Sequence, residues 1–271
     1  MGLSLLLLLL AGCIAGFLAG FFGVGGGIIL VPILLYYFHV IDISSLVATH
    51  LAFGTSLLIV IFASIPSAYE HNKNGNVLWK AVVIMGVASV VGSFVGGTVA
   101  ASLEGKVLQQ IFASVVTIAA IRLLIEQKGS KRNAQTNLSP IGLGSIGMIV
   151  GLVSSLAGVG GGVFSIPMMY YFMKFPLKRA LGTSSATIVI TAVASTIVYV
   201  VNGWNAVDVY APQLASYTAG YVNYVHSIPI IIGTVPMAKL GASVAQKTHA
   251  DNLRRFYAVF LLAIAMKMFF F

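Results

Sequence analysis

The chain has 271 residues, of which 59% are hydrophobic and only 8% are charged, and its mean hydropathy is +1.00. This composition excludes a soluble globular protein and leaves no room for a soluble catalytic domain, since one membrane crossing takes roughly 20 apolar residues. The apolar runs are long and continuous, which favours membrane helices over the alternating strands of a barrel. We therefore expect an all-α polytopic membrane protein, with a formal net charge of +9.

The first apolar segment, residues 3–38, carries the glycine run Gly25-Gly26-Gly27 in its middle. The stretch that ends at Cys13 is similar to a lipoprotein cleavage box, but no Lys or Arg precedes it and the apolar run continues to Phe22. We therefore expect a first membrane segment that is not removed. As the chain has one cysteine, an intramolecular disulfide and a cysteine metal cluster are excluded.

The second half of the chain repeats the pattern of the first. Gly25-Gly26-Gly27 with Pro32 is matched by Gly160-Gly161-Gly162 with Pro167 at the same spacing, and Gly54-Thr55-Ser56 is matched by Gly182-Thr183-Ser184. This predicts a first transmembrane repeat over 1–126, a cytoplasmic linker over 127–139 and a second transmembrane repeat over 140–271. Two insertions break the match and are expected to be loops, one around His39 to Val47 and one from Gly203 to Thr218.

The Lys and Arg residues decide whether each glycine segment crosses the membrane or doubles back. If residues 3–38 and 140–173 each crossed once, the 15 basic residues would divide almost evenly between the two sides, against the positive-inside rule. If both segments double back at their glycines, only Lys106 and Lys267 fall on one side, and the other side carries all the rest. These are Lys73, Lys80, Arg122, Lys128, Lys131, Arg132, Lys174, Lys178, Arg179, Lys239, Lys247, Arg254 and Arg255. We therefore predict re-entrant hairpins, with the larger basic group in the cytoplasm and both termini on the non-cytoplasmic side.

Each half then consists of a glycine-rich hairpin followed by three transmembrane helices. The predicted helices lie near 45–68, 77–101 and 106–126, matched by 180–201, 221–246 and 252–270. A unit with an odd number of arms returns upside down when it is repeated, so the halves are predicted to be inverted-topology repeats. The second hairpin arms, 28–38 and 163–173, span only about 16 Å as helices, so we expect the hairpin tips near the bilayer midplane.

The paired glycine runs are candidate anion sites. Each run opens a short helix, so free backbone N–H groups and the positive end of the helix point into the turn. We predict substrate binding by Gly25, Gly26, Gly27, Gly160, Gly161 and Gly162, with hydroxyls from Thr55, Ser56, Thr183, Ser184, Ser154 and Ser155. The competing interpretation is that these small and hydroxylated residues only let membrane helices pack closely.

Three further polar residues complete the candidate site. His50, whose repeat counterpart is Lys178, is predicted to carry a proton or to contact the anion; an interfacial histidine is the alternative. Lys239 lies inside the helix predicted over 221–246, where a buried ammonium indicates function, whereas snorkelling to the interface is the competing account. Asn223 is predicted to be either a ligand or a hydrogen-bonding residue at a helix end.

The motifs resemble those of the sulfite exporter TauE/SafE family of bacterial membrane permeases. The resemblance rests on Gly23-Val-Gly-Gly-Gly with Pro32, on His50 to Leu57, on Gly158-Val-Gly-Gly-Gly with Pro167, on Gly182-Thr-Ser-Ser, and on Gly203-Trp204 followed by Gly220-Tyr-Val-Asn223. It covers nearly the whole chain. It implies a multi-pass permease of the bacterial inner membrane for sulfite, sulfonates or related small sulfur-containing anions.

The residues agree with a transporter of small anions that uses alternating access and has no catalytic residues. The sequence holds no nucleotide-binding loop, HExxH motif or carboxylate cluster, so we expect no cofactor, no metal and no nucleic-acid partner. Besides the anion and the lipid bilayer, the partners expected are a coupling proton or ion, and a homodimer is one oligomeric state open to the chain. An anion channel, an intramembrane enzyme using Ser56 or Ser184 with His50 or His226, and a cation carrier are the alternative functions.

Overall fold

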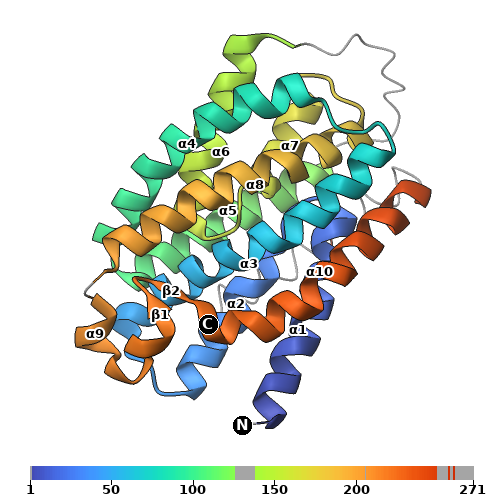
Figure 1. The fold of residues 1–271 in the computed structure, drawn as a ribbon. Coiled ribbons are helices and arrows are strands. Elements are labelled where there is room, and N and C mark those ends of the chain that lie inside the picture. The colour runs from blue at the N-terminus through green and yellow to red at the C-terminus, as the bar shows by residue number, and fades with distance from the viewer. Residues whose placement is uncertain (1, 126–137, 205, 249–255, 257–258, 260–271) are drawn as a thin grey trace.

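The computed structural model describes residues 2–125, 138–204, 206–248, 256 and 259 of a helical bundle (Figure 1). Within these residues, six helices are long and apolar enough to cross a membrane. They are α1 (Gly2–Phe22), α3 (Ser45–Lys73), α4 (Trp79–Ser102), α6 (Pro140–Ala157), α8 (Leu177–Asn202) and α10 (Tyr224–Lys247). The predicted all-α polytopic membrane protein is thereby confirmed.

The remaining elements are shorter or lie at the ends of the bundle. Helices α2 (Gly27–Val40) and α7 (Gly162–Tyr171) have 14 and 10 residues, and α5 (Gly105–Ile125) follows α4. The segment before α10 holds α9 (Ala206–Tyr210), the 3-10 helix η1 (Pro212–Tyr217) and the antiparallel two-residue strands β1 (Thr218–Ala219) and β2 (Val222–Asn223). The insertion predicted as a loop over Gly203 to Thr218 is therefore largely helical, because its apolar residues Val207 and Leu214 are buried and fold α9 and η1 onto the bundle.

Both glycine segments break at the predicted places. Helix α1 ends at Phe22 and α2 begins at Gly27, and α6 ends at Ala157 and α7 begins at Gly162. In the two turns, Gly25 and Gly160 have φ values of 79° and 82°, and Gly26 and Gly161 have 83° and 85°. These are left-handed conformations that glycine adopts without steric cost, which explains why both turns are built from glycine.

Each first hairpin arm packs on a helix of the other half. A Cβ on Gly12, Gly16 or Gly20 of α1 would lie within 2.4 Å of a backbone carbonyl oxygen of α10, at Ile230, Thr234 and Ala238 in turn. Because both sets of residue numbers rise together, α1 and α10 run parallel. Helices α6 and α4 pack in the same way, with Gly147 against Met85 and Gly151 against Ser89. Small residues thus let the backbones approach closely, as is typical of membrane helices.

Helices α3 and α8 form the centre of the bundle and run antiparallel (Figure 1). The early part of α3 contacts the late part of α8, since a Cβ on Gly54 would lie 3.2 Å from the Cβ of Tyr199. Toward the other end, the hydroxyls of Ser67 and Ser185 are hydrogen bonded at 3.0 Å. These two helices occupy matching places in the sequence repeat, so matching elements run in opposite directions.

The predicted helices agree with those observed to within a few residues at most ends. The ranges 45–68, 77–101, 180–201 and 221–246 correspond to α3, α4, α8 and α10, and 106–126 to α5. The first predicted loop, His39 to Val47, contains the end of α2 and the start of α3. Apart from residues 256 and 259, the predicted helix over 252–270 lies outside the described residues, as does most of the linker over 127–139. The division into two repeats, their inversion across the membrane and the depth of the hairpin tips remain predictions.

Candidate functional site

The two glycine turns meet in the interior of the bundle. A Cβ on Gly27 would lie 2.6 Å from the Cα of Val159, and a Cβ on Gly162 would lie 2.4 Å from the Cα of Val24. Each turn therefore packs its helix-opening glycine on the backbone of the other turn, in a reciprocal contact. Both glycine runs, Gly25–Gly27 and Gly160–Gly162, are buried.

The short helices α2 and α7 present their N-termini at this contact. The first hydrogen bonds of α2 run from the N–H groups of Ile29 and Leu30 to the carbonyl oxygen of Gly26, at 3.0 and 3.1 Å. In α7, Phe164 and Ser165 donate to the carbonyl oxygen of Gly161 at 3.2 and 3.1 Å. The amides that precede these bonds have no acceptor within the helix and carry the positive end of its dipole. The turns therefore offer N–H donors that suit an anion.

Two aliphatic side chains, one from α3 and one from α8, contact both glycine turns. The Cγ1 of Val60 lies 2.8 Å from the Cβ position of Gly25 and 2.6 Å from that of Gly160. The Cγ2 of Ile188 lies 3.1 Å from both positions. Val60 on α3 and Ile188 on α8 thus each contact both turns, so a movement of either helix changes the space at both.

The threonines of the repeated Gly-Thr-Ser motifs bind the backbone where a helix begins. The Oγ1 of Thr55 accepts a hydrogen bond from the N–H of Asn223 at 2.9 Å, and the Oγ1 of Thr183 accepts one from the N–H of Leu78 at 3.1 Å. Asn223 and Leu78 are the N-cap residues of α10 and α4. Thr55 and Thr183 thus stabilise the first turns of α10 and α4, which occupy matching places in the repeat. This agrees with the packing interpretation of the two residues. Asn223 itself caps α10, because its Oδ1 accepts from the N–H of His226 at 2.9 Å.

The predicted serines divide into bonded and unbonded hydroxyls. Ser184 donates to the carbonyl oxygen of Gly23 at 3.1 Å and pairs with Ser165 at 2.7 Å, and Ser155 pairs with Ser195 at 2.7 Å. The Oγ atoms of Ser56 and Ser154 are buried and have no hydrogen-bond partner. Ser154 lies at the second turn, where its Cβ is 3.4 Å from the Cβ position of Gly161. The unbonded hydroxyls are the ones free to bind a ligand.

His50 and its repeat counterpart Lys178 occupy equivalent positions at opposite ends of the α3–α8 pair. The Nε2 of His50 is bonded to the carbonyl oxygen of Ala100, in the last turn of α4, at 3.1 Å. The Nζ of Lys178 donates to the carbonyl oxygen of Gln246, in the last turn of α10. Both side chains cap a helix C-terminus, where positive charge is favourable. His50 is also stacked on Tyr221, with ring centroids 4.9 Å apart, and its Nδ1 has no partner.

Lys239 is exposed, whereas one of the two sequence interpretations predicted a buried ammonium at this position. Its side chain is exposed on α10, whereas the neighbouring Ala238 faces α1 and is fully buried. The orientation of α10 places Lys239 on the outer side of the bundle. Lys239 is therefore not a buried ammonium, and the structure does not bring it to the glycine turns; its snorkelling to the interface remains a prediction.

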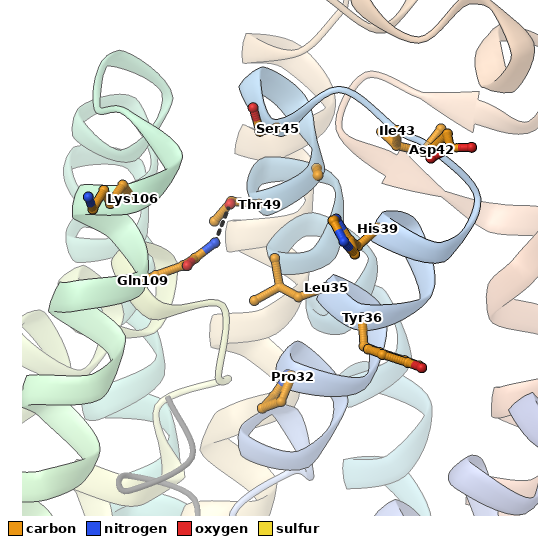
Figure 2. A pocket seen from close by; sticks show the side chains of 11 residues that line it. Pro32, Leu35, Tyr36, His39, Asp42, Ile43, Ser45, Thr49, Lys106 and Gln109 are labelled. Atoms are coloured by element: carbon orange, nitrogen blue, oxygen red, sulfur yellow. Dashed lines mark hydrogen bonds between the residues drawn. The ribbon is translucent and has the colours of Figure 1, made fainter. Parts of the chain in front are cut away.

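A pocket that the sequence reasoning missed lies beside the second half of α2 (Figure 2). It has a volume of about 700 Å³, and Leu35, His39 and Thr49 line it with Gln109 of α5, whose Nε2 donates to the Thr49 Oγ1 at 2.9 Å. Part of its wall comes from the insertion around His39 to Val47, which has no counterpart in the second half. That unmatched insertion was the signal that could have indicated it. The pocket contains none of the predicted site residues.

The sequence that folds into these paired helical hairpins is similar to those of known membrane proteins. Residues 8–268 match the family described as sulfite exporter TauE/SafE. A probable membrane transporter protein of Haemophilus influenzae is 31% identical over 98% of both chains. One of Methanocaldococcus jannaschii is 33% identical over 93% of this chain and 90% of its own. The probable membrane transporter protein YunE of Bacillus subtilis is 24% identical over 98% of this chain and 97% of its own.

These matches and the six apolar helices indicate a multi-pass membrane transporter. The chain belongs to the sulfite exporter TauE/SafE family, as its motifs predicted. No solved structure gives a significant match to it.

Proposed function

We propose that this protein is a secondary transporter that moves sulfite, sulfonates or related small sulfur-containing anions across the bacterial inner membrane. The anion would bind between the two glycine turns, which would face each side of the membrane in alternation. The observation that carries the proposal is the reciprocal contact of the turns, because it places the N-termini of α2 and α7 at one buried point.

The chemistry of the surrounding groups favours an anion over a cation. Backbone amides and the unbonded hydroxyl of Ser154 beside the second turn are donors that suit the oxygens of a sulfur oxyanion. The acidic residues that the structure describes are Asp42, Glu70, Glu104 and Asp208, and they lie in loops, at a helix end or in the short helix α9. A carboxylate would repel an anion inside the membrane, so its absence from the middle of these helices supports anion transport.

Alternating access requires the turns to separate, because an ion does not fit where a single Cβ would overlap the opposite backbone. The hydrogen bonds by which His50 and Lys178 cap two helix C-termini can account for two conformations. The bond of His50 to Ala100 joins α3 to α4 at one end of the α3–α8 pair, and that of Lys178 to Gln246 joins α8 to α10 at the other end. Release of one cap while the other holds would open the site to one side at a time. If the repeats are inverted, the two conformations would have similar free energies.

Binding to the purified protein tests this proposal. Sulfite, methanesulfonate and acetate are titrated against the wild type, Ser154→Ala and Ser145→Ala, and the melting temperature is recorded. Ser145 is a matched control on α6, since its hydroxyl is exposed and bonded to the carbonyl oxygen of Ile141. A bound anion stabilises by an amount that grows with its concentration over Kd, about 2.7 kcal/mol at 100 times Kd.

We expect the sulfur anions to raise the melting temperature of the wild type and of Ser145→Ala. Ser154→Ala should bind them about tenfold more weakly or worse, because a hydrogen bond to a charged group contributes roughly 1.5–3 kcal/mol. No stabilisation by either sulfur anion would contradict the proposed substrate class. Equal affinity in Ser154→Ala and Ser145→Ala would contradict the assignment of the second turn.

A further inference from the structure

Ser64 is a buried hydroxyl whose position in a membrane helix needs an explanation. It lies on α3, is 1% exposed, and its Oγ has no hydrogen-bond partner. Hydroxyls in membrane helices usually bond to a carbonyl of the preceding turn, as the Oγ1 of Thr187 does to Thr183 at 2.9 Å. An unbonded hydroxyl in an apolar interior has a desolvation cost of about 1–3 kcal/mol. A ligand that accepts its hydrogen bond would remove this cost.

The hydroxyl of Ser64 faces the first glycine turn. Its Oγ lies 3.2 Å from the point that a Cβ on Gly25 would occupy, on the side where Gly25 leaves room. Gly25 and Gly26 directly precede the first residue of α2, so the hydroxyl lies beside the amides at the N-terminus of that helix. The helix end and the hydroxyl are independent donors aimed at the same place.

The repeat shows that the two turns obtain their hydroxyls from different helices. Alignment of Gly54-Thr55-Ser56 with Gly182-Thr183-Ser184 places Ala192 opposite Ser64, so α8 has no hydroxyl at this position. The second turn instead has Ser154 on α6, and its counterpart on α1 is Ala19. Each turn is thus accompanied by one unbonded, buried hydroxyl, Ser64 at the first and Ser154 at the second. Packing alone gives no reason why α3 supplies the hydroxyl at the first turn and α6 supplies it at the second.

We propose that Ser64 is a substrate-binding and specificity-determining residue. Its hydroxyl donates a hydrogen bond to an oxygen of the sulfur oxyanion that the amides of the first turn hold, which rests on the function proposed above. The oxygens of a sulfite or sulfonate project in three directions from sulfur, and those of a carboxylate lie in one plane. When the amides of the helix end hold two oxygens, the hydroxyl on the side of α3 meets the third, which a carboxylate lacks, so Ser64 favours the sulfur anion over a carboxylate of similar size.

The test compares Ser64→Ala with Ser67→Ala in the full-length purified protein. Ser67 lies three residues further on α3 and is equally buried, but its hydroxyl is already bonded to Ser185 at 3.0 Å. Affinities for methanesulfonate and acetate are measured by calorimetry in both variants and in the wild type, together with the melting temperature without added anion. The ratio of the two affinities is a readout that a merely structural role of Ser64 would not change.

We expect Ser64→Ala to bind methanesulfonate about tenfold more weakly, with acetate changed less and the melting temperature kept or raised. Ser67→Ala should keep the wild-type ratio of affinities. The inference is overturned if Ser64→Ala keeps both affinities, or if both variants lose them equally. If the wild type binds no sulfur anion, the proposed function fails and the inference fails with it. If the wild type binds sulfur anions and Ser64→Ala binds them equally well, only the role of Ser64 is removed.

Discussion

Replacing Gly27 with alanine is expected to destabilise the protein severely and to abolish transport. The added Cβ would lie 2.6 Å from the Cα and 2.7 Å from the carbonyl oxygen of Val159, and backbone atoms cannot rotate away as a side chain can. Gly27 is the first residue of α2 and lies outside the positive-φ region, so the effect comes from overlap between the turns and not from backbone strain. Overpacking costs about 1–3 kcal/mol where side chains can adjust, and we expect at least the upper value here.

The measurement is the melting temperature and folded yield of the purified variants, with transport assayed on whatever folds. Gly162→Ala should behave in the same way, because its Cβ would lie 2.4 Å from the Cα of Val24 in the reciprocal contact. Gly144→Ala on α6 is the control, since a Cβ there meets nothing within 4 Å. A Gly27→Ala protein as stable and active as Gly144→Ala would show that the turns do not pack on each other.

The second large effect is expected in a labelling experiment on the membrane topology. Cys13 is the single cysteine, so Cys13→Ser gives a background into which one cysteine can be introduced at a time. Lys106→Cys should react with a membrane-impermeant maleimide in intact cells, because Lys106 is predicted on the non-cytoplasmic side. Lys73→Cys and Arg179→Cys should react only after the membrane is permeabilised. All three side chains are exposed, so reactivity reports the side of the membrane and not burial.

The outcome bears directly on the inverted repeats. Between Lys73 and Arg179 lie α4, α5 and the second hairpin, so if α4 and α5 each cross the membrane, the two residues share a side only if the second hairpin returns to the face from which it entered. Labelling of Arg179→Cys in intact cells would mean that residues 140–173 cross the membrane, and the inverted arrangement would then be wrong. Labelling of Lys73→Cys and Lys106→Cys from the same side would contradict a crossing by α4.

Much of the fold could be predicted because the repeat and the charges are encoded in sequence spacing. Two runs of three glycines, each followed by a proline five residues later, indicated where two long apolar segments break. The structure has these breaks and gives their cause, since Gly25, Gly26, Gly160 and Gly161 all adopt positive φ. A break in a membrane helix is conspicuous in sequence because few residues other than glycine tolerate that conformation.

The roles of individual polar residues were harder to predict, since they depend on which neighbour each helix face meets. Thr55 and Ser56 are adjacent in sequence, yet Thr55 holds the start of α10 and the hydroxyl of Ser56 has no partner. Lys239 lies within an apolar helix but on its exposed side. Spacing within one helix does not reveal such partners, because they lie far away in the sequence: Asn223 is 168 residues from Thr55.

Counterflow in proteoliposomes tests most directly the claim that the protein is a carrier for small sulfur anions. Purified protein is reconstituted into vesicles loaded with unlabelled sulfite, and uptake of radioactive sulfite is followed, with vesicles that contain no protein as the controls. A carrier with one alternating site predicts a transient accumulation above equilibrium that saturates with external sulfite and is absent from the controls. Sulfite flux without accumulation or saturation would indicate a channel, and equal flux in protein-free vesicles would contradict sulfite transport by this protein.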